Sequence, residues 1–350
     1  MLQNLYKGDK LSSARVDTKV TVPKDKYLEI LGFTIYSYIT RKITPYSTMR
    51  GGVRTLGEYI ENFVYGKVAE VALQIFLKNK MNIETLTDID LTDFIEGMYL
   101  PDLIVIKRDT DYEPLKLWIE VKEVRRDQRW LLIPISAVKS RPYDLYVAVW
   151  VGLPDDHVAW LVKHVPDVLN RMSSEWRRRF EDIGKNVENI PCEIIGFVTW
   201  NDVSLVVKAR EGDRSAQQEL NKKFGQRRWH YFSKNERLFD PEDPSWEGSG
   251  VGENIGFYLK KLREVSEWNT FRALILDNRR LVELTALKDV KMKKGKKKKG
   301  SFPETCEGMR AGEDFREFAQ RCIELQLDEM KRRHGSLLRT KSWFEQPLKA

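Results

Sequence analysis

Residues 143–151 (YDLYVAVWV) constrain the fold more than any other run in this sequence. Apart from Asp144 the run is apolar, so a strand made from it needs cover on both faces. Further strand-like and helical runs alternate with it along the chain. The strand-like runs are residues 100–107, 115–124 and 191–199, and the helical ones are residues 26–43, 167–183 and a long pattern from residue 55. This order predicts an α/β fold with a mixed central sheet flanked by helices.

The remaining segments predict extra helical pieces at both ends of this core. Beyond the fourth strand we expect a helix over residues 254–265, short strands over 271–276 and 281–286, and a helix over 312–334. The expected division is a helical N-terminal segment (1–50), a main domain (51–290) with a polar, turn-rich insertion near 211–250, a lysine-rich linker (291–300) and a helical C-terminal tail (301–350).

Net charge narrows the class of partner. The chain carries a formal charge of +8 and has a pI of about 9.1, which favours a polyanion such as nucleic acid. No apolar run approaches the roughly 20 residues of a membrane span, and no signal peptide is visible, so we expect a cytoplasmic protein without a membrane partner. The sequence also lacks the phosphate-binding loop pattern of ATP-driven motors.

Two neighbouring strand-like runs carry a chemically specific set of side chains. Glu120 and Lys122 share one face of the run 115–124, because strands have a period of two. Asp102 begins the preceding run, and an antiparallel hairpin of the two runs would bring it beside Glu120. Two carboxylates suit Mg²⁺, which activates water for phosphodiester hydrolysis. A lysine beside them would position that water, deprotonate it, or offset the developing charge.

These residues resemble the signature of the PD-(D/E)XK nucleases. Pro101-Asp102 followed by Glu120-Val121-Lys122 matches the motif, residues 66–70 (GKVAE) are similar to the helix that precedes it, and residues 143–149 to the strand that follows. The resemblance implies a restriction-endonuclease-like core and assigns roles to individual residues. Asp102, Glu120, the Val121 carbonyl and Glu70 would be the metal ligands, Lys122 the catalytic lysine, and Glu70 an accessory acid. An exposed helix glutamate is the competing interpretation of Glu70.

Within that superfamily the chain looks most like a Type II restriction endonuclease. The resemblance implies a sequence-specific, Mg²⁺-dependent enzyme that cuts double-stranded DNA, with a cognate DNA methyltransferase encoded nearby. A homodimer is expected, because one cluster cuts one strand and a two-fold pair cuts both. The alternatives are another nuclease of this superfamily, acting on structured DNA or RNA, and a non-catalytic nucleic-acid-binding protein with a nuclease-like fold.

Five arginines in two polar segments are candidates for DNA contacts. They would bind phosphates or read guanine edges, and the competing interpretation is a solvated loop with surface salt bridges. They are Arg125, Arg126, Arg129, Arg227 and Arg228.

Overall fold

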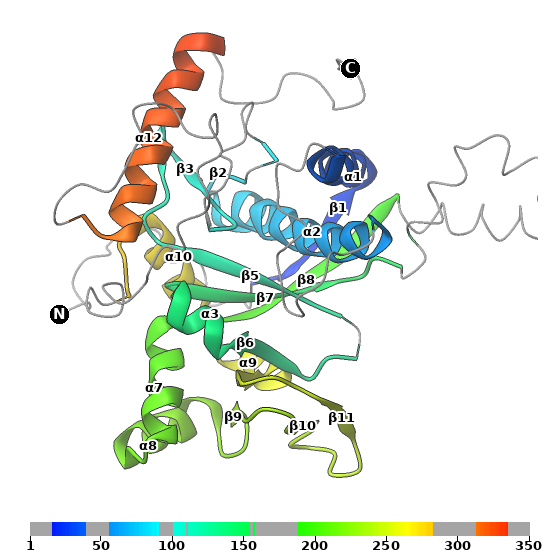
Figure 1. Cartoon of the computed structure of the whole chain (residues 1–350), viewed down its shortest axis with the longest axis vertical. Coiled ribbons are helices and arrows are strands. Elements are labelled where there is room, and N and C mark those ends of the chain that lie inside the picture. The colour runs from blue at the N-terminus through cyan, green and yellow to red at the C-terminus, as the bar shows by residue number, and fades with distance from the viewer. Residues whose placement is uncertain are drawn as a thin grey trace, which may run out of the picture.

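A mixed four-stranded sheet lies at the centre of the computed structural model (Figure 1). β5 and β7 run parallel, and the other neighbours are antiparallel. In sheet order the strands are β1 (Lys19–Pro23), β8 (Asn189–Thr199), β7 (Leu145–Val151) and β5 (Ile119–Val124). The structure describes residues 16–39, 56–87, 89–90, 101–109, 111–125, 127–154, 157, 188–282 and 313–334.

β7 occupies the interior position that its composition predicts. It lies between β8 and β5, and every residue from Leu145 to Val149 is buried. Its parallel register with β5 sets Glu120 opposite Tyr146 and Lys122 opposite Ala148. The expected mixed sheet flanked by helices is therefore confirmed.

Helices cover the two faces of this sheet with separate cores. On one face, α2 lies across the strands with α1 beside it (Figure 1), and side chains such as Val64 and Val68 pack with Val121 and Val147. On the other face, Tyr146 and Ala148 pack with α7, α8 and α9. The helices are α1 (Lys24–Ile39), α2 (Leu56–Met81), α3 (Ile135–Ser140), α7 (Trp200–Arg210), α8 (Arg214–Phe224), α9 (Leu259–Val265), α10 (Trp268–Asp277) and α12 (Phe315–His334).

Smaller sheets surround the main one. The first has the order β2-β3-β4, the second β6-β12-β9, and β10 pairs with β11. Their strands are β2 (Thr85–Leu86), β3 (Val105–Arg108), β4 (Asp111–Pro114), β6 (Trp130–Pro134), β9 (Trp229–Phe232), β10 (Arg237–Phe239), β11 (Glu247–Gly250) and β12 (Asn254–Tyr258). No helix among the described residues is long and apolar enough to cross a bilayer.

The prediction of one hairpin from residues 100–107 and 115–124 is wrong in its pairing. β3 pairs with β4, which forms within the segment predicted to be a loop, and the chain then crosses to the main sheet as β5. β3 begins only at Val105, so Asp102 precedes the strand.

Two predictions beyond β8 also need correction. The polar, turn-rich residues 211–250, for which no elements were predicted, hold α8 and three strands. Residues 254–258 form the buried strand β12, and only 259–265 are helical; a Cβ on Gly256 would lie 2.5 Å from Phe232, so β12 needs glycine there. Residues 271–276 belong to a helix, α10, because Phe271 and Ile275 bury one helical face.

Each remaining prediction is either confirmed or concerns residues outside the described part of the chain. The C-terminal helix is confirmed as α12, capped by Asp314, whose carboxylate accepts the Arg316 and Glu317 amides at 2.9 and 3.0 Å. The N-terminal segment contributes β1 to the main sheet as well as α1. The predicted helix over 167–183 and the lysine-rich linker lie outside the described residues, as do residues 283–286 of the last expected strand.

Candidate active site

Two backbone hydrogen bonds hold Asp102 against the start of β5. The Asp102 amide donates to the Ile119 carbonyl at 3.2 Å, and the Val121 amide donates to Asp102 Oδ2 at 2.6 Å. Asp102 therefore reaches the strand that carries Glu120 and Lys122, although the predicted hairpin does not bring it there. The sequence prediction that these three residues converge is thus supported by a different backbone path.

The alternation of β5 presents the acid and the lysine on one face. Ile119 and Val121 are buried in the core under α2, whereas Glu120 and Lys122 are half-buried. Lys122 Nζ forms an ion pair and hydrogen bond with Glu120 Oε1. Apolar and charged side chains that alternate over residues 119–122 are what the period of two predicts for a strand.

Asp102 has a strongly shifted acidity. Burial, together with repulsion from the Glu120 carboxylate, raises the pKa of Asp102 to about 7, against the opposing attraction of Lys67 and Lys122. Burial disfavours the charged form of an acid, and a like charge nearby does the same. The two carboxylates are therefore close enough to repel each other.

Lys122 keeps its proton at this site. Burial acts to lower the pKa of Lys122, but the attraction of Glu120 and Asp102 outweighs it, and the pKa is raised. A protonated ammonium donates hydrogen bonds and offers positive charge, but it cannot accept a proton. Of the roles that the sequence left open for Lys122, orientation and charge compensation fit this state.

Sequence reasoning missed Tyr143, which precedes β7. The ring is buried and lies 6.1 Å from that of Trp118 and 5.9 Å from that of Tyr146. Burial, followed by the negative charges of Glu120 and Asp102, raises the pKa of Tyr143 well above its usual value, and a hydrogen bond to Glu120 adds to the shift. The phenol thus remains a donor beside Glu120.

The accessory acid of the sequence prediction lies on α2 with a partner of its own. Glu70 Oε2 is 2.7 Å from Lys67 Nζ, and both side chains are at most 10% exposed. This burial excludes the interpretation of Glu70 as an exposed helix glutamate. The only sequence signal for Lys67 is its position three residues before Glu70, on the same helix face.

Arg125 and Arg129, at the far end of β5, contact protein groups. Arg125 lies 3.1 Å from Glu61 and over the Tyr65 ring, which ties this end of β5 to α2. Arg129 pairs with the buried Asp240 at 3.2 Å. The two side chains stay 38% and 45% exposed, so each guanidinium remains accessible to solvent. Arg126 lies outside the described residues.

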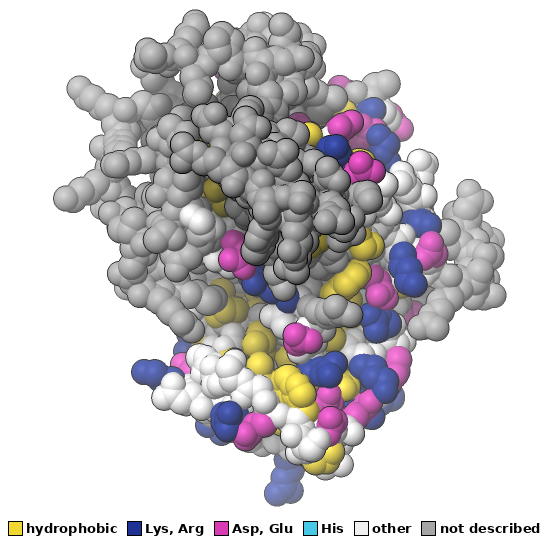
Figure 2. Space-filling view, turned by 90° about the vertical axis from the view of Figure 1, so that its right-hand side faces the viewer, with side chains coloured by type: hydrophobic (Ala, Val, Ile, Leu, Met, Phe, Trp, Pro, Cys, Tyr) yellow, Lys and Arg dark blue, Asp and Glu magenta, His cyan; other side chains and the backbone are white. Residues whose placement is uncertain are grey.

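The other two candidate arginines, Arg227 and Arg228, directly precede β9. Arg228 pairs with Glu242 at 3.3 Å, and Arg227 lies 5.5 Å from the centre of the Phe239 ring. Basic and acidic side chains alternate over the described part of the surface in Figure 2, and no single basic patch dominates that view. These contacts match the salt-bridge interpretation and leave DNA binding by the arginines as a prediction.

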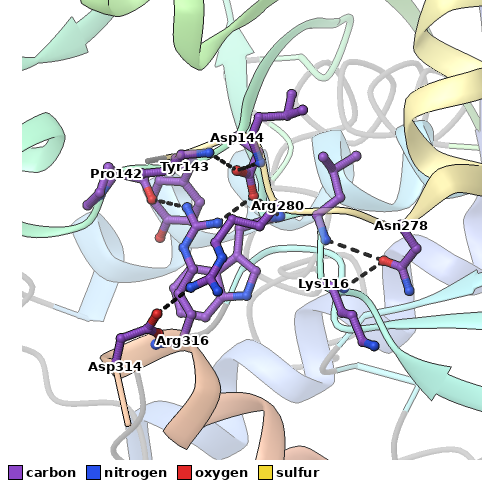
Figure 3. A network of polar contacts seen from close by, with 12 residues as sticks. Lys116, Pro142, Tyr143, Asp144, Asn278, Arg280, Asp314 and Arg316 are labelled. Carbon is purple, nitrogen blue, oxygen red and sulfur yellow. Dashed lines mark hydrogen bonds and ion pairs between the residues drawn. The ribbon is translucent and has the colours of Figure 1, made fainter. Parts of the chain in front are cut away.

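A buried charge network fixes the backbone just before β5. Asp144 is fully buried, and its carboxylate accepts the amides of Trp118 at 2.7 Å and of Leu281 and Val282 at 2.6 and 2.7 Å. Arg316 of α12 reaches the same carboxylate at 2.5 Å and also bonds the Pro142 carbonyl (Figure 3). The segment leading to Glu120 is thus held from two distant parts of the chain.

Asn278 holds the backbone where the chain leaves β4 and crosses to β5. It ends α10 in the left-handed region, at a φ of 50°, and its side-chain oxygen accepts the amides of Lys116 at 2.6 Å and Leu117 at 3.3 Å (Figure 3). Asparagine tolerates this conformation better than most residues. Asn278 and Asp144 together define where the chain leaves β4 and enters the main sheet.

Comparisons of the chain with protein-family models, with curated proteins and with solved structures find no match. The residues themselves must therefore decide which chemistry fits.

The donor set fits a hard divalent cation. Asp102 and Glu120 supply oxygens at adjacent points, and their mutual repulsion is relieved when a cation lies between them. Within the described residues, no group of three or more acidic, histidine or cysteine side chains is arranged to hold a metal ion. Two carboxylates with a backbone carbonyl match Mg²⁺, which keeps several waters and seldom uses an all-protein cage.

Proposed function

We propose that this protein is a magnesium-dependent endonuclease of the PD-(D/E)XK type with a restriction-endonuclease-like core. The observation that carries the proposal is the meeting of Asp102, Glu120 and Lys122 at the start of β5. The order of elements supports it: a helix with a buried glutamate, then the aspartate, then the Glu-x-Lys strand, then a buried strand parallel to it.

The chain's own residues divide the work among them. Asp102, Glu120 and the Val121 carbonyl would hold the Mg²⁺ ion, which when bound supplies an activated water and stabilises charge on the phosphate. The Val121 amide fixes the rotation of Asp102, and Tyr143 steadies Glu120 from the side of β7. Lys122 orients the water through its protonated ammonium and offsets negative charge on the phosphate in the transition state.

Double-stranded DNA is the substrate that we propose, with sequence specificity of the Type II restriction kind. The net charge of +8 and the exposed guanidinium groups of Arg125 and Arg129 near β5 support a polyanionic duplex. A homodimer would cut both strands of a palindrome, and a cognate methyltransferase would protect the host's own sites.

The test is incubation of long unmethylated DNA with the protein in Mg²⁺ or in EDTA, read on a gel. We expect discrete bands that require Mg²⁺. The Lys122→Ala protein should bind the DNA without cutting it, and the exposed Lys139→Ala should cut like the wild type. Cleavage by Lys122→Ala would refute the site assignment. A smear would remove the specificity, and cleavage of structured RNA alone would change the substrate.

A further inference from the structure

Helices α7 and α8 form a helical hairpin on the face of the main sheet opposite α2 (Figure 1). Its turn is three residues long and contains Gly212, whose φ of 100° suits glycine. Asp213 caps α8 by accepting two backbone amides of its first turn. At the other end of α8, Lys223 Nζ donates to the buried carboxylate of Asp202 in α7 at 2.6 Å. Both ends of α8 are therefore held in place.

One face of α8 is buried, and the opposite face is exposed. The buried residues recur every four positions and are Ala216, Leu220 and Phe224. The exposed residues with the same spacing on the opposite face are Arg214, Gln218 and Lys222. None of these three side chains forms a hydrogen bond or ion pair with another residue that the structure describes. A fixed helix thus presents a row of polar side chains that folding alone does not explain.

The side chains in this row are of the types that recognise the edges of base pairs. Arginine donates two hydrogen bonds to guanine, and glutamine forms two with adenine, both in the major groove. That groove admits an α-helix, and the first residues of such a helix make most of its base contacts. Arg214 begins α8 and Gln218 lies one turn later. Lys222 lies near the end of the helix, where an ammonium would meet a phosphate.

The segment around α8 is strongly basic. Residues 208–228 hold seven basic and three acidic side chains, so their net charge is +4, which is half of the +8 of the whole chain. Of the seven basic side chains, Lys223 and Arg228 pair with acidic ones, and the other five form no ion pair with a described residue. This local excess of positive charge favours a polyanion as the partner of the exposed face.

The helix lies on the same side of the main sheet as the charged face of β5. Glu120 and Lys122 stand in register beside Tyr146 and Ala148 of β7, and side chains in register on neighbouring strands point to the same face. Tyr146 and Ala148 pack in the core that includes the buried face of α8. The candidate active site and α8 therefore face the side of the sheet from which one duplex would reach both.

We propose that α8 enters the major groove of double-stranded DNA, where Arg214 and Gln218 read base edges and Lys222 binds a phosphate. The inference deepens the proposed function by naming the helix that selects the sequence to be cut. It rests on the proposed function for the identity of the substrate.

The experiment measures DNA binding in EDTA, so that its result depends on neither metal nor cleavage. The wild type selects duplexes from a randomised library, and fluorescence anisotropy then gives the affinity for the selected duplex and for a scrambled one. Arg214→Ala and Gln218→Ala should each weaken binding of the selected duplex about tenfold and that of the scrambled duplex less than about threefold. Arg214→Lys should lose the same preference, because an ammonium cannot replace the paired hydrogen bonds of a guanidinium.

Lysine variants separate phosphate contacts from base contacts. Lys222→Ala should weaken binding of both duplexes alike and reduce the salt dependence of the affinity by about one ion. The matched control is Lys78→Ala, which removes an exposed lysine from α2 and should change neither quantity.

The outcomes separate this inference from the proposed function. A wild type that enriches no sequence, or an unchanged preference in both Arg214→Ala and Gln218→Ala, would overturn the inference and leave Mg²⁺-dependent cleavage to be judged by itself. Tighter binding of structured RNA than of any duplex would also overturn it, because the major groove of A-form RNA does not admit these side chains. Sequence selection through α8 without any cleavage in Mg²⁺ would instead refute the proposed function alone. Thermal midpoints equal to that of the wild type show that the variants are folded, as expected for exposed side chains.

Discussion

Replacing Asp102 by asparagine should stabilise the metal-free protein at alkaline pH while it abolishes the proposed cleavage. The native pKa of Asp102 is raised from 3.8 to about 7, a difference of roughly three units. Each unit corresponds to about 1.36 kcal/mol, so the ionised carboxylate lowers the free energy of unfolding by at most ~4 kcal/mol. The carboxamide of the Asp102→Asn variant would still accept the Val121 amide, so the backbone contact survives the change.

The raised pKa of Asp102 determines how the stability difference between Asp102→Asn and the wild type changes with pH. For an acid with a raised native pKa, the folded state holds the proton longer than the unfolded state. The contribution of this group to the free energy of unfolding is therefore fully present below a pH of about 4 and is lost as the pH rises to about 7. In EDTA, the gain of Asp102→Asn over wild type should be near zero at about pH 4 and largest at about pH 8.

Urea unfolding at both pH values measures this difference, with Asp127→Asn as a control on an exposed residue. Added Mg²⁺ at ten times its dissociation constant should raise wild-type stability by about 1.4 kcal/mol and leave Asp102→Asn unchanged. An equal gain at both pH values, or a loss at about pH 8, would refute the argument that burial and the Glu120 charge strain Asp102.

Three further substitutions test the framework around the site. Arg316→Met should lower the free energy of unfolding by about 3–5 kcal/mol, because it leaves the carboxylate of Asp144 buried without its guanidinium; adding Asp144→Asn should recover part of that loss in the same urea titration. Gly256→Ala should cost about 1–3 kcal/mol by thermal unfolding, since the new methyl group would meet Phe232 at 2.5 Å; an unchanged midpoint would contradict this packing. Thr199→Ala removes the capping box at the start of α7 and should cost about 1 kcal/mol, whereas the exposed Lys208→Ala in the same helix should not.

Long patterns in the sequence were sufficient to predict the main helices and strands. The helical pattern from residue 55, the uncharged run of β7 and the helical run over 312–334 each extend over many residues, and the structure confirms an element of the predicted type in each place. The run 271–276 was too short to separate a strand from a buried helix, because so few residues show no clear period. The N-cap Asp213 is a local signal that could have revealed α8 within the supposed insertion.

The site was predictable in its residues but not in its backbone path. The alternation of β5 pairs Glu120 with Lys122 on one face, and this follows from the sequence alone. The break between β4 and β5 cannot be predicted from the sequence alone, because it depends on Asn278, which lies more than 160 residues away in the chain. The burial of Lys67 is equally hidden, since its spacing to Glu70 is the same in an exposed pair and is decided only when α2 packs on the sheet.

The buried contact between Asp144 and Arg316 links the order of synthesis to the order of assembly. Asp144 leaves the ribosome 172 residues before the guanidinium that neutralises its carboxylate is made. Until Arg316 has emerged, the carboxylate of Asp144, which precedes β7 and binds the backbone amide of Trp118 before β5, lacks its cation, and the strand bearing Glu120 and Lys122 lacks its last anchor. A nascent or prematurely ended chain would thus be held back from its finished form by the position of one arginine in the sequence.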